Sequence, residues 1–279
     1  MKTNYHTHCY FCDGADDPES YVAAALKKGF SSLGFSSHAP VPFETDWTMK
    51  EENLAPYLER INSLKELYQD RIEIYRGLEI DYIRNLTGPS SPKFQNIGLD
   101  YRLGSIHFIQ SLKSGRYLTL DGPAEEFEEL LEVNFNNNIR KMISHFYELL
   151  RLMLSEHKFD IVSHFDLYKA QNRGEKYFDE NSLWHKDEIM QTLELISGKD
   201  VIIEVNTGGW ARGKTEYLYP SRWILKQIHS LHIPVTINTD AHKPDLLDAF
   251  YDKAVDELKE LGFTEYMILK NGSWMNRPI

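Results

Sequence analysis

The sequence has few cysteines, no long apolar run and no excess of positive charge, and each of these shortages excludes a class of protein. No apolar stretch approaches the roughly 18–20 residues that span a bilayer, so we expect no membrane partner. The N-terminus lacks the apolar region of a signal peptide, which makes the cytoplasm the expected location. With 42 acidic and 31 basic residues, the formal net charge of −11 disfavours a nucleic-acid partner, because such a partner requires a basic surface.

The only two cysteines, Cys9 and Cys12, form a C-x-x-C pair. This spacing occurs in redox pairs and in halves of zinc sites. A four-thiolate zinc site needs a second pair, which is absent, and the next helix signal, at Pro18, comes too late for a thioredoxin-like pair. We therefore interpret both as free thiols in a loop.

Strand and helix signals alternate along the whole chain. Strands are expected from Tyr5 onward and over residues 31–36, 71–81, 99–109, 159–166, 201–206 and 234–242. Helices are expected over residues 18–28, 51–69, 123–157 (as one helix or two), 181–197, 221–231 and 246–261. Near-continuous apolar strands separated by helices predict a parallel sheet covered by helices. Because about seven units follow one another without a G-x-G-x-x-G motif, a closed barrel is favoured over a doubly wound sheet.

Histidines and carboxylates gather at the ends of these strands. Six of the 11 histidines lie there: His6, His8, His38, His107, His164 and His242. Carboxylates occupy the same places: Asp13, Glu79, Asp81, Asp166 and Asp240. In a parallel barrel all strand exits meet on one face. This set fits a site for several metals better than a catalytic triad, since no serine or cysteine nucleophile sits in a strand-to-helix elbow.

The motifs also resemble a known family. They are His6-Thr7-His8, Ser37-His38, Gly77-Leu78-Glu79-Ile80-Asp81, Gly104-Ser105-Ile106-His107, Ser163-His164-Phe165-Asp166, Glu204-Val205-Asn206 and Thr239-Asp240-Ala241-His242. In order and spacing they resemble the PHP (polymerase and histidinol phosphatase) superfamily, and in particular its histidinol-phosphatase branch. The resemblance covers nearly the whole chain. It implies a distorted seven-stranded (β/α)7 barrel, one domain over residues 1–279, and three divalent metal ions.

Carried over residue by residue, the resemblance implies three ligand sets. The first is His6, His8, Glu79 and Asp240; the second is Glu79 as a bridge with His107 and His164; the third is Asp13, His38 and His242. Ser163 and Thr239 stand where other members often carry Gly and Ser, and both are small. Asp81, Asp166 and Asn206 are expected to orient imidazoles or to close the barrel mouth. Mixed histidine and carboxylate ligands accept Zn, Fe or Mn, so the metal stays open.

Two arginines are candidates for binding phosphate. Arg212 follows a Gly-Gly turn after the sixth strand, and Arg173 lies in the loop after the fifth. A guanidinium fork matches phosphate oxygens. Two rim loops, residues 41–50 and 171–181, are acidic. In the first of them Phe43, Glu44, Asp46 and Trp47 could contact an imidazole or amine of a substrate, or simply pack the loop.

The expected activity is hydrolysis of a small phosphate ester by an enzyme with catalytic roles for Arg212, Arg173, Asp240 and His242. Either water held by a metal or His242 could protonate the departing alkoxide. The resemblance implies L-histidinol phosphate as the substrate, within histidine biosynthesis. The alternatives are a PHP-type nuclease or nucleotide phosphoesterase, and a non-catalytic metal-binding regulatory module. The oligomeric state is not predicted.

Overall fold

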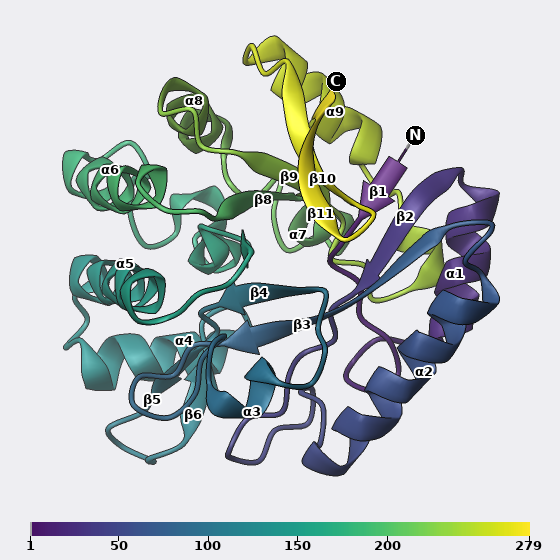
Figure 1. The fold of residues 1–279 in the computed structure, drawn as a ribbon. Coiled ribbons are helices and arrows are strands. Elements are labelled where there is room, and N and C mark those ends of the chain that lie inside the picture. The colour runs from purple at the N-terminus through teal and green to yellow at the C-terminus, as the bar shows by residue number, and fades with distance from the viewer. Residues whose placement is uncertain (1) are drawn as a thin grey trace.

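Seven parallel strands form a nearly closed barrel in the computed structural model, which describes residues 2–279 (Figure 1). In sheet order they are β1 (Lys2–Asn4), β2 (Phe30–Phe35), β3 (Glu73–Asp81), β4 (Tyr101–Ser105), β7 (Ile161–Val162), β8 (Ile202–Asn206) and β9 (Val235–Asn238). The first and last strands meet beyond their regular ends, where His8 N donates to Ala241 O at 2.9 Å and Ala241 N donates to His6 O at 3.2 Å. The expected distorted (β/α)7 barrel is confirmed.

Most of the helices lie around the outside of the sheet (Figure 1). They are α1 (Pro18–Lys27), α2 (Leu54–Leu67), α3 (Pro92–Gln95), α4 (Ala124–Glu129), α5 (Ile139–Glu156), α6 (Leu183–Ser197), α7 (Gly208–Ala211), α8 (Arg222–Ser230) and α9 (Tyr251–Glu260). The α1 helix begins as its sequence predicts, with Asp17 accepting a hydrogen bond from Glu19 N at 2.9 Å. The stretch over residues 123–157 is divided before α5, because Asn136 and Asn137 adopt left-handed backbone conformations.

Two hairpins were not predicted. The strand expected over residues 99–109 ends at Ser105, and the chain then forms an antiparallel hairpin of β5 (Phe108–Gln110) and β6 (Tyr117–Thr119). Beyond Ser105 the backbone leaves the sheet, and His107 N donates to the side chain of Asp81, 26 positions earlier, at 3.0 Å. The C-terminal tail forms a second hairpin of β10 (Glu265–Lys270) and β11 (Ser273–Pro278). Asn271-Gly272, both with positive φ, make its turn.

An aromatic plug fills the bottom of the barrel, where the strands begin. Tyr101 lies there because Gly34 and Gly77 leave room: a Cβ on either glycine would stand 2.3 or 2.4 Å from atoms of the tyrosine ring. The Tyr101 hydroxyl donates to Tyr5 O at 2.7 Å and to Phe35 O at 3.1 Å. The C-terminal hairpin covers this end, with Leu269 N donating to the Tyr5 hydroxyl at 2.8 Å.

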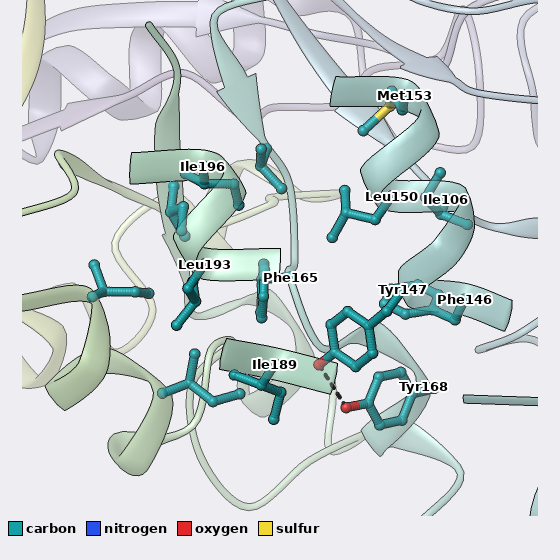
Figure 2. Packing of buried hydrophobic residues seen from close by; sticks show 14 of the residues in the cluster. Ile106, Phe146, Tyr147, Leu150, Met153, Phe165, Tyr168, Ile189, Leu193 and Ile196 are labelled. Atoms are coloured by element: carbon teal, nitrogen blue, oxygen red, sulfur yellow. Dashed lines mark hydrogen bonds between the residues drawn. The ribbon is translucent and has the colours of Figure 1, made fainter. Parts of the chain in front are cut away.

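A second part of the core lies between the barrel and helices α5 and α6. Figure 2 shows apolar side chains of both helices facing each other, and the buried hydroxyls of Tyr147 and Tyr168 joined by a hydrogen bond of 2.8 Å. This packing fixes the loop after β7, which carries His164. Among residues 2–279, no helix has the length and apolarity needed to cross a membrane.

Candidate metal centre

Glu79, near the end of β3, is the centre of a buried group of imidazoles at the carboxyl ends of the strands. Its Oε2 lies 2.9 Å from His38 Nδ1 and 3.1 Å from His6 Nε2. Its other oxygen, Oε1, lies 2.8 Å from His164 Nε2 and 3.7 Å from His107 Nε2. One carboxylate therefore faces imidazoles from four different strand exits.

Asp240, which follows β9, supplies a second buried carboxylate. Its Oδ1 lies 3.1 Å from His8 Nε2 and 3.6 Å from His6 Nε2. Its backbone is left-handed, with φ of 47°. A non-glycine residue held in this conformation stores strain, and such strain is concentrated at functional sites.

Asp13 completes an outer part of the centre. Its Oδ2 lies 3.2 Å from His242 Nε2, and its Oδ1 lies 3.8 Å from both His8 Nδ1 and His38 Nε2. The loop can place Asp13 there because Gly14 follows: a Cβ at Gly14 would stand 2.3 Å from Cys9 N. The turn thus closes tightly between the first strand exit and His242.

Ligand atoms of these side chains form three close groups, each with its atoms within 4.8 Å of one another. The groups are His6, His8 and Asp240; His38, Glu79 and His107; and His8, Asp13, His38 and His242. His164 joins the centre through Glu79. The structure therefore brings together all nine expected ligands, but it divides them differently from the expected sets, since His8 and His38 each belong to two groups.

Four atoms at this centre are buried and, although they approach one another closely, form no hydrogen bond within residues 2–279: His6 Nε2, His8 Nε2, His38 Nδ1 and Glu79 Oε2. Buried polar atoms in proteins almost always have a partner. Here four of them converge, and imidazole nitrogens with carboxylate oxygens are ligands that Zn, Fe and Mn accept. The residues present therefore fit divalent metal ions.

Two further carboxylates hold the imidazoles in place. Glu204 Oε1 lies 2.6 Å from His6 Nδ1, and Asp81 Oδ1 lies 2.9 Å from His107 Nδ1, so each ring directs its other nitrogen toward Glu79. Asp81 was predicted from the sequence as a residue that could orient an imidazole in this way. Glu204 was not, although a carboxylate inside an otherwise apolar strand was the available signal. Asn206 donates to Glu204 Oε2 at 2.8 Å.

Asp166 does not orient an imidazole. It accepts a hydrogen bond from Ser221 N at 3.1 Å and lies 3.5 Å from Lys169 Nζ, and it thereby fastens the loop before α8 at the barrel mouth. Of the two roles open for Asp166, closing the mouth is the one that its contacts support.

The carboxylates give the centre a field that favours cations. Burial alone would lower the pKa of each histidine, but Glu204 raises the pKa of His6 and Glu79 raises that of His38, so that both lie above the ordinary value. At His107 burial is likewise outweighed by Asp81 and Glu79, and the pKa rises to about 10. A divalent ion would take the place of these protons.

A cavity of about 470 Å³ opens directly onto this centre. Arg212 lines it and donates to Asp240 O at 2.6 Å and to Asp240 Oδ2 at 2.8 Å. Lys214, which the sequence did not single out, lines it too and lies 2.8 Å from Asp121 Oδ2. Although burial raises the pKa of Asp121, Lys214 and His107 hold it at about 2, so the cavity wall carries a fixed ion pair.

The remaining predicted residues lie around this cavity or outside it. Asp46 and Trp47 line it, whereas Phe43 and Glu44 line an adjoining cavity of about 810 Å³ bounded by the β5–β6 hairpin. Arg173 lines neither. Its side chain is half exposed, donates to Gly213 O at 3.2 Å and lies 3.5 Å from Glu216 Oε1.

The family model for the PHP domain matches residues 4–208, which include the strands β2 to β8 and most of the histidine centre. The chain belongs to the PHP domain family. It is 28% identical over 263 residues to the histidinol-phosphatase of Bacillus subtilis, covering 87% of this chain and 94% of the relative.

Two crystal structures share the fold of this PHP protein. One, from Listeria monocytogenes, has a TM-score of 0.79 and 21% sequence identity, covering 90% of this chain and 99% of the other. The second is histidinol phosphate phosphatase of Lactococcus lactis, complexed with zinc, L-histidinol and phosphate. It has a TM-score of 0.71 and 20% identity, and the match covers 98% of both chains.

Proposed function

We propose that this PHP protein is a metal-dependent histidinol-phosphatase, which hydrolyses L-histidinol phosphate to L-histidinol and phosphate in histidine biosynthesis. The observation that carries the proposal is the convergence of four buried, unpartnered ligand atoms beside a cavity lined by Arg212 and Lys214. Similarity to the Bacillus subtilis histidinol-phosphatase over most of both chains supports the choice of substrate.

The proposed ligands of three divalent ions, whether Zn, Fe or Mn, are those named from the sequence: His6, His8, Asp13, His38, Glu79, His107, His164, Asp240 and His242. Glu79, whose oxygens lie within 3.7 Å of five imidazoles, would contribute to two of the proposed ligand sets. When bound, such ions act as Lewis acids that lower the pKa of water from 15.7 toward roughly 7 and offset the charge of the phosphoryl group.

The chain itself supplies the binding of phosphate. Arg212 is held in position by Asp240, which leaves the rest of its guanidinium facing the cavity. Burial alone would lower the pKa of Arg212, but Asp240 and its other neighbours raise it, so the side chain remains charged. Lys214 is the second proposed phosphate contact. Arg173 requires a movement of its loop to reach the same point, because it now pairs with Glu216.

The alcohol end of the substrate carries an amine and an imidazole, and the cavity rim matches both. Asp46 offers a carboxylate to the amine, and Trp47 offers an aromatic face, stacked at 4.9 Å on Phe108. The same acidic rim would repel a polyanionic strand. His242 Nδ1 lies 2.9 Å from Arg212 and 3.0 Å from Asp240 O, so these groups hold the ring at the cavity wall with Nε2 directed to Asp13, as a ligand would require.

The test is turnover of a panel of phosphate esters by protein loaded with Zn, Fe or Mn. Histidinol phosphate should be hydrolysed with a higher kcat/KM than nucleotides, sugar phosphates or single-stranded DNA, the last assayed at low salt where its binding would be strongest. Comparable cleavage of DNA, abolished by His107→Ala, would instead support the nuclease. Bound metal without turnover of any ester would support the regulatory module.

A further inference from the structure

The tight turn between His8 and Asp13 holds a thiol against one of the proposed ligands. Cys12 N donates to Cys9 O at 3.0 Å, and the Cys12 thiol donates to the same carbonyl at 3.5 Å. The Cys12 sulfur also lies 3.5 Å from His8 Nδ1, on the side of the ring that faces away from Glu79 and Asp240.

The direction of these hydrogen bonds follows from their chemistry. A carbonyl oxygen only accepts, so in the hydrogen bond to Cys9 O the thiol is the donor, and with its proton there the sulfur presents a lone pair to His8. A neutral imidazole has one N–H and one nitrogen lone pair. In this arrangement His8 Nδ1 carries the proton, and the lone pair of Nε2 is directed to Asp240 Oδ1 at 3.1 Å and Glu79 Oε2 at 3.5 Å. That is the tautomer needed for a metal ligand.

We propose that Cys12 is the positioning residue of His8: its sulfur selects the Nδ1–H tautomer and fixes the ring, and so helps retain the metal. Carboxylates do the same for His6 and His107. At His8 the nearest carboxylate oxygen on that side, Asp13 Oδ1, is 3.8 Å away, which leaves the thiol as the hydrogen-bond partner. The inference rests on the proposed metal centre but not on which ester is hydrolysed.

Cys9 provides a matched control in the same turn. Its side chain is fully buried and its sulfur lies 3.2 Å from Ser37 Oγ, which is not a proposed ligand. Removing the Cys9 thiol should disturb packing as much as removing the Cys12 thiol, without freeing an imidazole. Any difference between the two variants in holding metal therefore reports on the contact with His8.

The experiment measures the rate at which zinc passes from the loaded protein to a chelating indicator. We expect release from Cys12→Ala to be about 10–100 times faster than from wild type, as for other residues that orient ligands, and release from Cys9→Ala to stay within about twofold. Equal rates for the two variants would overturn the proposal. Cys12→Ser, which keeps a hydrogen-bonding atom, should release zinc more slowly than Cys12→Ala.

A second pair of variants covers the case in which Cys12→Ala does not fold. Cys12→Val fills the space of the thiol without a hydrogen-bonding atom and should release zinc about tenfold faster than Cys12→Ser. Equal release from these two would also overturn the proposal. A wild-type protein that binds none of Zn, Fe and Mn would instead overturn the metal centre of the proposed function, and with it this role of Cys12.

Discussion

The two ends of the barrel differ in which polar atoms they bury without a hydrogen-bond partner within residues 2–279: at the bottom these include the hydroxyls of Thr3 and Thr236, whereas at the mouth they are imidazole nitrogens and a carboxylate oxygen that face one another. At the bottom, the hydroxyls of Tyr5 and Tyr101 each have hydrogen-bond partners, and Trp274 Nε1 donates to Asp160 at 3.1 Å. At the mouth, ligand atoms of His6, His8, His38 and Glu79 are equally buried and have no partner among residues 2–279. In barrels of this kind the bottom face serves stability and the top face serves activity. We infer from this difference that the unpartnered atoms at the mouth are arranged to bind a cation.

Of the substitutions considered, replacing Glu79 should cause the largest loss of metal and of activity. Its carboxylate lies beside five imidazoles, so Glu79→Gln should lose two metal ions together. The value of kcat/KM should fall by about 10³-fold or more, because several kcal/mol of charge stabilisation depend on those ions. Elemental analysis beside steady-state kinetics measures both. Protein that retained its full metal content would show that Glu79 is not a bridge.

Replacing Arg212 should weaken activity while leaving the metals in place. We expect Arg212→Ala to lose about 2–4 kcal/mol in kcat/KM, because a desolvated, charge-assisted contact with phosphate is removed. Arg222→Ala is the control, since Arg222 is exposed, pairs with Glu257 and Glu260 and does not line the cavity, and we expect a change below about twofold. Loss of metal from Arg212→Ala would mean that its contact with Asp240 supports the centre rather than the substrate.

Replacing Tyr101, at the bottom of the barrel, should lower stability without lowering activity. Tyr101→Phe leaves the carbonyls of Tyr5 and Phe35 without this donor, which should lower the free energy of unfolding by about 1–3 kcal/mol. Urea denaturation of the metal-free protein measures this loss. The value of kcat should change by less than about twofold, and a large fall in kcat would mean that the two ends are coupled.

The strands and the ligands could be predicted from the sequence because both leave local patterns. A buried parallel strand is a short apolar run, and the histidines sit where each run ends. What could not be predicted depends on contacts between distant segments. Lys214 becomes part of the site only when the loop carrying Asp121 folds beside it, and Glu204 is explained only by His6, 198 positions away.

The C-terminal hairpin, by contrast, was not predicted although the sequence contains a signal for it. Asn271-Gly272 between alternating apolar residues predicts the C-terminal hairpin by itself. For residues 99–109 the apolar pattern runs on beyond Ser105, whereas the backbone leaves the sheet there and His107 N donates to Asp81, 26 positions earlier. The division of ligands into groups was also beyond sequence reasoning, because His8 and His38 each reach two groups in space.

Replacing Asp46 should produce the smallest effect and test how far the mouth selects its substrate. Asp46 lines the cavity but is absent from the three groups of ligand atoms, so Asp46→Asn should leave metal content and kcat unchanged. If its carboxylate pairs with the substrate amine, KM for histidinol phosphate should rise about three- to tenfold, corresponding to roughly 1 kcal/mol for a partly exposed ion pair. An ester without an amine, such as phenyl phosphate, is the matched control substrate, and its KM should not rise. An equal rise for both esters would mean that Asp46 shapes the loop rather than recognising the amine, and the recognition of the alcohol end would then have to come from the aromatic side chains of the rim.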